Sequence, residues 1–185
     1  ATMASMSELG IDGSVIQVKT VEQISTLDGL IIPGGESTVI GQMSLVNGAI
    51  KKIKEKIESG MPVFGICAGM VFLSKNSQDR IVGNVDQPLL DILDVKIERN
   101  SFGRQKDSFE AKISMEPIGI SSFHGVFIRA PSVSETGSGV EVLAKFNEKI
   151  VAVKQGNVIA TAFHPELTKD TSLHKSFVKL VDNQS

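Results

Sequence analysis

The chain's architecture follows from one stretch, Met61-Pro-Val-Phe-Gly-Ile-Cys67-Ala-Gly-Met-Val-Phe-Leu73. An apolar run enters a short Gly-Ile-Cys-Ala-Gly segment and a second apolar run leaves it, which is typical of a strand, a sharp turn and a helix. Cys67 lies at the predicted turn, where the flanking glycines are expected to let the backbone bend. Because a helix N-terminus favours the nucleophilic thiolate, we interpret Cys67 as a nucleophile rather than as a buried packing cysteine.

Composition limits the classes of protein to which the chain can belong. Its 185 residues, 41% hydrophobic and 22% charged, suffice for one α/β domain, which we expect to span residues 1–185. A net charge of −2 indicates neither nucleic acid nor a membrane surface as a partner. The single cysteine excludes an internal disulfide and favours a reducing, cytoplasmic location. The sequence shows no apolar run long enough to span a membrane and no secretory signal.

Apolar strands and amphipathic helices alternate on the N-terminal side of the chain. We expect strands at 14–19, 29–32 and 62–66, a short helix near residue 20, one helix that opens at 37 or 38 and ends at Ser59-Gly60, and a helix after Cys67. This alternation predicts βαβ units around a mainly parallel sheet.

The pattern changes to period-two strands from about residue 91, after a predicted loop at 76–90. We expect half-buried strands near 93–98, 109–113, 125–130 and 140–144, then a hairpin of 150–154 and 157–163 around Gln155-Gly156, and a closing helix near 173–181. The predicted fold is therefore α/β, with a mainly parallel central sheet covered by helices and an antiparallel extension.

His164-Pro165-Glu166 follows the last predicted strand. If the chain stays extended here, the imidazole and the carboxylate face the same side, and Pro165 helps to keep that geometry. Cys67 would lie on the same carboxyl edge of the sheet, where open α/β sheets place their sites. We therefore interpret Cys67, His164 and Glu166 as a catalytic triad in which Glu166 orients the imidazole. The alternative for His164 and Glu166 is a turn with two surface side chains.

Pro33-Gly-Gly-Glu-Ser37 also follows a predicted strand. The backbone N–H of Gly35, with that of Ala68, could form an oxyanion hole. A phosphate loop is a rival interpretation, but the segment lacks the Walker lysine and Glu36 would repel phosphate. A tight turn with a helix cap also remains open.

Together these segments resemble the class I (triad) glutamine amidotransferases. The matching motifs are 33–38, 65–69 and 163–167, in this order and spacing. Segments 98–105, 107–110 and 125–131 are similar to those of the glutaminase subunits of two-protein pyridoxal 5′-phosphate synthases. The resemblance covers roughly residues 12–182 and implies a three-layer, flavodoxin-like fold. It also implies hydrolysis of L-glutamine through a thioester, with ammonia passed to a TIM-barrel synthase subunit that makes vitamin B6.

The resemblance also implies which residues hold the substrate. By motif position these are Gly35, Glu36, Ser37, Arg99, Ile128 and Arg129. A guanidinium suits the substrate's α-carboxylate, although each arginine could instead form a surface salt bridge. Neither a cofactor nor a metal is expected. Partner contact or a structural role is open for Arg104, Asp107 and Glu110, and we interpret His124 and His174 as surface or packing residues.

One departure from this family concerns the start of the chain. Family members open with a strand ending in a Leu-Gln-Gly turn, which is not seen here, and we interpret residues 4–10 as the end of the helix that follows it. The chain is then truncated, or a mobile stretch between Met3 and Ala4 is missing from it. Three further hypotheses are another cysteine hydrolase or redox sensor, a non-catalytic stabilising subunit, and the glutaminase of imidazole glycerol phosphate synthesis. The segments 98–110 and 125–131 disfavour the last of these.

Overall fold

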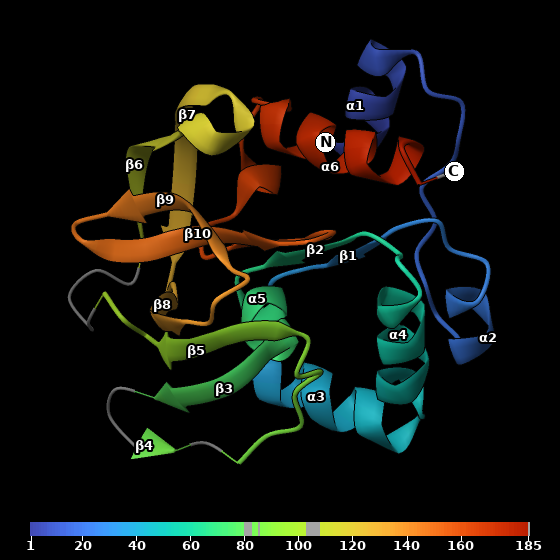
Figure 1. Ribbon diagram of the computed structural model, residues 1–185, viewed down its shortest axis with the longest axis horizontal. Helices are drawn as coiled ribbons and strands as arrows, with labels where there is room; N and C mark the ends of the chain where they lie inside the picture. Colours follow the sequence, from blue (N-terminus) through green and yellow to red (C-terminus); the bar gives the residue numbers. More distant parts are fainter. Residues whose placement is uncertain (80–82, 85, 103–107, 185) are drawn as a thin grey trace.

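Eight of the strands form a continuous path through one sheet in the order β1-β2-β11-β10-β8-β5-β3-β4, and β9 pairs with β10 (Figure 1). The computed structural model describes residues 1–79, 83–84, 86–102 and 108–184. The strands of this sheet are β1 (Leu30–Ile32), β2 (Val63–Ile66), β3 (Ser74–Asp79), β4 (Gly83–Asn84), β5 (Leu93–Arg99), β8 (Ser132–Thr136), β9 (Glu141–Phe146), β10 (Lys149–Gln155) and β11 (Val158–Thr161). A separate antiparallel pair consists of β6 (Ser108–Met115) and β7 (Ile120–Ile128).

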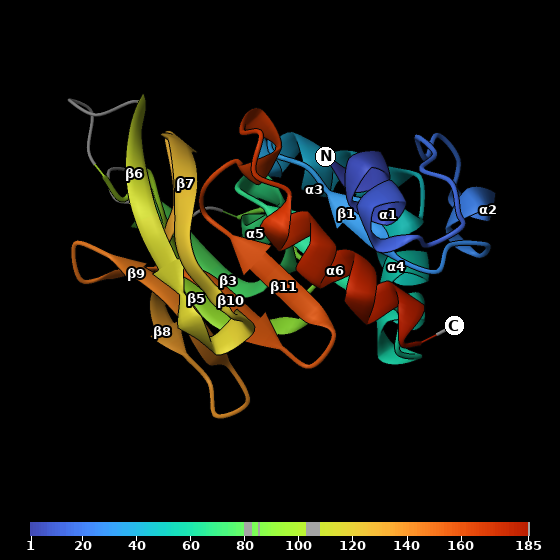
Figure 2. The ribbon, with the colours of Figure 1, turned by 90° about the horizontal axis from the view of Figure 1, so that it is seen from above.

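The helices lie on both sides of the β1-β2-β11 part of the sheet (Figure 1, Figure 2). They are α1 (Thr2–Leu9), α2 (Val21–Ile24), α3 (Ser37–Val46), α4 (Ala49–Glu58), α5 (Ala68–Leu73) and α6 (Ser172–Asp182), with short 3-10 helices η1 (Glu116–Ile118) and η2 (Pro165–Leu167). Strand β2 pairs in parallel with β1 and with β11. This α/β arrangement confirms the predicted fold class.

Strand β2 is the centre of the core because both of its faces are covered. Its four residues are all buried. The ring of Phe64 contacts His174 and Phe177 of α6, at centroid distances of 5.7 and 5.8 Å. The next residue, Gly65, faces Leu73 of α5 on the opposite side. Successive residues of one apolar run therefore contact helices on opposite faces of the sheet, as expected for a strand buried on both faces.

The antiparallel extension begins at the predicted hairpin. Strands β10 and β11 pair with Gln155 opposite Val158, which confirms the hairpin, although its turn is Gly156-Asn157, one residue later than predicted. Strand β10 also pairs antiparallel with β8 and β9, and β5 pairs antiparallel with β8. The β6–β7 pair packs through stacked phenylalanines, with Phe109 and Phe127 4.5 Å apart between ring centroids. This packing gives the extension an aromatic core of its own.

Several predicted elements are confirmed and others are wrong. The one helix expected from residue 37 or 38 to Ser59-Gly60 is two helices, α3 and α4, because Gly48 between them has a left-handed φ of 78°. The helix near residue 20 begins with a capping box, in which the side chain of Gln23 accepts a hydrogen bond from the Thr20 backbone N–H at 3.1 Å. Segment 14–19 is not a strand, and Val15 and Ile16 are each 49% exposed, because alternation yields a strand only where a sheet edge and a buried face are available. Residues 4–9 do belong to a helix, α1, which packs on α6.

The predicted loop at 76–90 is partly wrong. Residues 74–79 form β3, which pairs in parallel with β5, and residues 83–84 form β4. Residues 80–82 and 85 of this segment lie outside the described residues. Strand β8 was not predicted, and β7 begins at Ile120, five residues before the expected start. The polar sequence of β3 carries no strand pattern. This strand is held in the sheet by backbone hydrogen bonds to β5 and not by burial of its side chains.

Candidate active site

Three segments that follow neighbouring parallel strands meet at one edge of the sheet. Residues 33–38 follow β1, Cys67 follows β2, and His164 lies just beyond β11. The carboxyl ends of adjacent parallel strands are where open α/β folds gather their functional groups. The sheet order therefore brings together three motifs that are far apart in the sequence.

Cys67 lies at a sharp, strained turn between β2 and α5. Its backbone angles are φ 50° and ψ −101°, which non-glycine residues rarely adopt. Its backbone N–H donates to the Thr161 carbonyl at 2.7 Å, and its Sγ lies 3.9 Å from the Ile128 carbonyl oxygen. These contacts with β11 and β7 fix the thiol, which is only 8% exposed.

The glycines around Cys67 have a different role from the predicted one. Neither Gly65 nor Gly69 has a positive φ, so Cys67 itself makes the turn. A Cβ at Gly69 would lie 2.1 Å from the Ile32 carbonyl oxygen, and one at Gly65 would lie 2.5 Å from Leu73 Cδ1. The glycines therefore allow α5 to pack directly on β1 and β2.

His164 and Glu166 are hydrogen-bonded, with 2.8 Å between Nδ1 and Oε1. The chain does not stay extended here, because Pro165 begins the 3-10 helix η2. The one-residue spacing nevertheless leaves both side chains on the same side. The backbone N–H of His164 donates to the Val126 carbonyl at 2.8 Å, and this bond anchors the segment to β7.

Electrostatic coupling gives His164 an unusual proton affinity. Hydrogen bonding to Cys67, and then to Glu166, raises the pKa of His164 to about 10 against the opposing effect of burial. Burial, the largest single cause, raises the pKa of Glu166, but the hydrogen bond from His164, a backbone hydrogen bond and the nearby charges together outweigh it, so the net pKa is lowered. The imidazole is therefore charged at neutral pH and lies between a sulfur and a carboxylate, which is the arrangement of an activated cysteine.

A cavity of about 270 Å³ opens beside Cys67 and His164. Its lining contains all six predicted substrate-binding residues and both predicted oxyanion donors, together with three residues that were not predicted. The lining residues are Gly35, Glu36, Ser37, Cys67, Ala68, Val71, Arg99, Asn100, Ile128, Arg129, Pro131 and His164. Glu166 does not line the cavity but is hydrogen-bonded to His164, which does.

The residues missed by sequence reasoning adjoin residues that were found. Asn100 follows Arg99, and Pro131 comes two residues after Arg129. Val71 lies one helical turn after Cys67, and its side chain is apolar. The close approach of Gly34 to His164 was also not predicted. A Cβ at Gly34 would lie 2.5 Å from His164 Cε1. Adjacency within the motifs was the signal that could have identified them.

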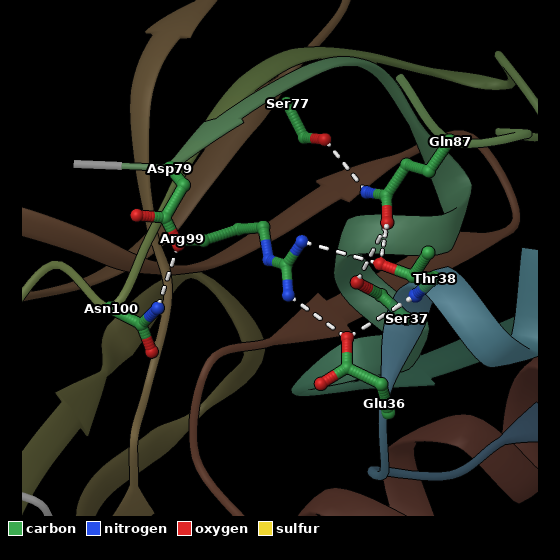
Figure 3. Close-up of polar contacts among 8 residues, drawn as sticks. All are labelled: Glu36, Ser37, Thr38, Ser77, Asp79, Gln87, Arg99 and Asn100. Atoms are coloured by element: carbon green, nitrogen blue, oxygen red, sulfur yellow. Dashed lines mark hydrogen bonds and ion pairs between the residues drawn. The ribbon is translucent and has the colours of Figure 1, made fainter. Parts of the chain in front are cut away.

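Arg99 is held at the cavity by an ion pair with Glu36 (Figure 3). Its Nη2 lies 2.9 Å from Glu36 Oε1, and its Nη1 donates to Thr38 Oγ1 at 3.4 Å. The surface salt bridge considered for Arg99 is thus real, but its partner is another predicted binding residue and the Arg99 side chain is only 18% exposed. Arg129 also lines the cavity and has a positive φ of 43°.

The remaining predicted residues lie elsewhere. Glu110 Oε2 is 2.7 Å from His124 Nε2 on the exposed face of the β6–β7 pair. His174 is 2% exposed and packs against Phe64, and burial lowers its pKa to about 4. These positions agree with a surface and a packing histidine. Arg104 and Asp107 lie outside the described residues.

The residues that the structure describes show neither a metal-binding cluster nor a membrane-spanning helix. Within them, no group of three or more His, Cys, Asp or Glu side chains could hold a metal ion. No helix among them combines the length and the apolar character needed to cross a membrane.

Comparison with known proteins places the chain, rather than any single site residue, in a family. The model of the SNO glutamine amidotransferase family matches residues 3–183. The chain belongs to this family. A solved structure described as a glutamine amidotransferase shares its fold at a TM-score of 0.85 and 43% identity, with coverage of 97% of this chain and 91% of that one.

Curated relatives of this SNO-family chain carry a more specific name. The chain is 64% identical over 179 residues to "Pyridoxal 5′-phosphate synthase subunit PdxT" of Nitrosopumilus maritimus, and the match covers 97% of this chain and 87% of that protein. It is 45% identical over 177 residues to the protein of the same name in Moorella thermoacetica, covering 96% and 90%. These names agree with the expectation drawn from segments 98–110 and 125–131.

Proposed function

We propose that the chain hydrolyses L-glutamine to glutamate and ammonia and supplies the ammonia to a pyridoxal 5′-phosphate synthase subunit. The observation that carries this proposal is the position of Cys67 and the hydrogen-bonded His164 beside one cavity that also contains Arg99. The name of the relatives and the family of the chain support the same reaction. In this proposal residues 1–185 act as one glutamine amidotransferase domain.

The first half of the reaction forms a thioester. The sulfur of Cys67 attacks the amide carbon, a C–S bond forms and the carbonyl electron pair moves onto oxygen. The backbone N–H groups of Gly35 and Ala68 stabilise this oxyanion. His164 then donates its proton to the amide nitrogen, the C–N bond breaks and ammonia leaves. Because Nδ1 of His164 is bonded to Glu166, the Nε2 atom is the one available to exchange this proton.

The second half releases glutamate. Neutral His164 removes a proton from water as the oxygen attacks the thioester carbon. The C–S bond breaks, the sulfur leaves as thiolate and the imidazole is charged again. Glu166 is not consumed in either half, since its role is to orient the ring and to stabilise its cationic form.

The polar residues of the cavity suit an amino acid. Arg99 and Arg129 can bind the α-carboxylate, whereas Glu36 and the Ile128 carbonyl can accept from the α-ammonium. Ser37 contributes through its backbone, because its side-chain hydroxyl is directed to Gln87 at 3.1 Å. The site therefore binds both charged groups on the α-carbon of glutamine, the carboxylate and the ammonium, and leaves the side-chain amide beside Cys67.

The partner in this proposal is a TIM-barrel synthase subunit, and the complex acts in the cytoplasm. Neither nucleic acid nor a membrane takes part. We expect low glutaminase activity from the isolated chain, because oxyanion donors in such enzymes are aligned by the partner. High activity of the isolated chain would contradict this expectation.

The first test is ammonia release from glutamine by the chain mixed with its synthase subunit, using wild type and Cys67→Ala. We expect activity to fall at least about 10³-fold in the variant, while its circular dichroism spectrum is unchanged. Cys67→Ser serves as a second variant that keeps a hydroxyl. Normal turnover by Cys67→Ala would sink the assignment of the nucleophile.

The same assay distinguishes the rival functions. A non-catalytic stabilising subunit would release no ammonia even with the synthase subunit present. A different cysteine hydrolase would act on peptides and leave glutamine intact, and a redox sensor would be oxidised at Cys67 by peroxide without turnover.

A further inference from the structure

Gln87 forms a buried polar junction beside the cavity but outside its lining (Figure 3). Its side-chain oxygen accepts hydrogen bonds from Ser37 Oγ at 3.1 Å and from Thr38 Oγ1 at 3.0 Å. Its amide nitrogen donates to Ser77 Oγ at 2.8 Å. Gln87 is 7% exposed, Ser37 3% and Ser77 4%, so these groups depend on one another for hydrogen bonds.

The neighbouring residues fix the orientation of this amide. Arg99 Nη1 donates to Thr38 Oγ1, and a guanidinium cannot accept a hydrogen bond. The single hydroxyl hydrogen of Thr38 is therefore free to point to Gln87, which must present its oxygen. The amide nitrogen is then left to face Ser77. The oxygen of Gln87 accepts two hydrogen bonds and its amide nitrogen donates one, in directions that are mutually consistent, which is the condition for a rigid network.

The backbone after Gln87 makes a second contact with the same helix. A Cβ at Gly41 would lie 2.4 Å from the carbonyl oxygen of Pro88. Gly41 lies one turn after Ser37 in α3. Segment 87–88 is therefore seated on α3 at two points, the side chain of Gln87 on the first turn and the backbone of Pro88 on the second.

This junction connects the two sides of the cavity. Ser77 belongs to β3, which follows the nucleophile helix α5 directly from Leu73 to Ser74. Ser37 and Thr38 form the first turn of α3, next to Gly35 and Glu36 of the cavity. The Gln87 side chain thus sets the distance between β3, the strand that follows the nucleophile helix, and the first turn of α3, which adjoins the substrate-binding part of the cavity.

We infer that Gln87 is a positioning residue for glutamine binding. It does not touch the substrate; it holds the Ser37–Thr38 turn and, through Thr38, the guanidinium of Arg99. This inference rests on the proposed function. It assigns to the 87–88 segment a role in substrate affinity that is separate from the nucleophile chemistry at Cys67.

The test is Gln87→Met, which keeps the volume and removes the acceptor and the donor. It is measured in the complex with the synthase subunit, with rates expressed per Cys67 titrated by iodoacetamide. We expect KM for glutamine to rise about tenfold, which corresponds to the loss of a buried hydrogen bond. We expect kcat per titrated thiol to stay within about threefold, because Cys67, His164 and Glu166 are untouched.

Ser74→Ala is the matched control. Ser74 is a fully buried serine at the start of the same strand, but among the described residues its hydroxyl bonds to the backbone alone, to Val71 O at 2.7 Å and Asn76 O at 3.2 Å. This variant is expected to lower the melting temperature and to leave KM unchanged. A structural effect alone would make Gln87→Met behave in the same way, with a lower melting temperature and an unchanged KM, and that result would overturn the inference.

A double-mutant cycle identifies the route of the effect. Because Gln87 acts through the Ser37–Thr38 turn, Gln87→Met combined with Thr38→Val should raise KM by less than the product of the two single effects. A fully multiplicative result would count against the inference. Should Gln87→Met fail to fold, Gly41→Ala displaces Pro88 instead and should also raise KM. A wild-type complex that releases no ammonia would refute the proposed function itself, a result distinct from an active wild type with an unaltered KM in these variants.

Discussion

The residue with the most demanding conformation is the candidate nucleophile. Cys67 occupies φ 50° and ψ −101°, which costs an ordinary side chain on the order of 1–3 kcal/mol. The hydrogen bond from its N–H to Thr161 and the packing of α5 on β1 hold it there. In return the thiol is presented to the cavity and to His164, so the strain is located where the chemistry takes place.

This strain predicts an unusual order of stability. Cys67→Gly should be more stable than Cys67→Ala by about 1 kcal/mol, because only glycine adopts the turn without a Cβ penalty. Urea unfolding of the two inactive variants measures the difference. Equal or reversed stabilities would mean that the turn is not strained.

At the scale of elements, the contact between α5 and β1 leaves no room for a side chain at one position. It depends on Gly69, where a Cβ would meet the Ile32 carbonyl oxygen at 2.1 Å. Helix α5 is only six residues long and all of them are buried, so it has no free side on which to move. The position of Cys67 therefore depends on a glycine two residues away.

Gly69→Ala should destabilise the fold by about 2–3 kcal/mol, at the upper end of overpacking effects, because the added methyl group meets backbone. Chemical denaturation of the variant measures the loss. Gly139→Ala is the matched control, since the nearest atom to a Cβ there is Gln155 Cγ at 4.0 Å and no strained φ is involved. A loss at position 69 no larger than at 139 would contradict the packing argument.

How far the sequence predicts each element depends on how local its cause is. Strand β2, the turn and α5 were predicted because the apolar runs and glycines that form them are contiguous. Strand β3 was not, because polar residues at 74–79 are held by pairing with β5, about twenty residues further along the chain. Segment 14–19 has the alternation of a strand but forms none. In the site, the short motifs gave the six predicted binding residues that line the cavity, whereas Val71, Asn100 and Pro131 were missed although they adjoin predicted residues.

For the whole molecule, the buried His174 and the partly buried His164 give opposite contributions to stability as pH changes. The pKa of His174 is lowered to about 4 by burial, and that of His164 is raised to about 10 by Cys67 and Glu166. The ordinary value is 6.5. The first favours the folded state when neutral and the second when charged, so their combined contribution is greatest near pH 6.5.

On the acid side, the unfolded state binds more protons at His174 between pH 6.5 and 4. Its contribution is complete above pH 6.5 and is lost as pH falls toward 4, so the free energy of unfolding should decrease in this window. His174→Leu, which keeps an apolar side chain against Phe64, should make that decrease shallower. Unfolding of both proteins at pH 4.5 and 6.5 measures the change, and parallel slopes would show that His174 does not contribute.

On the alkaline side, the native state binds more protons at His164 between pH 6.5 and 10. Its contribution is complete below 6.5 and is lost as pH rises through about 10. Glu166→Gln removes the carboxylate and should bring the pKa of His164 down, which NMR titration of the imidazole would show directly. An unchanged imidazole titration would mean that Glu166 does not stabilise the charged ring.

The ion pair of Arg99 with Glu36 has a consequence for how small anions behave at this protein. The guanidinium already has a resident counter-ion, so an entering carboxylate exchanges with Glu36 rather than filling a bare positive charge. Chloride or acetate, which offer no ammonium group for the displaced Glu36 to engage, gain little from that exchange. Glutamine offers both charges at once, and Glu36 can return to Arg99 when the product departs. We therefore expect the cavity at Arg99 and Glu36 to select zwitterions over simple salts.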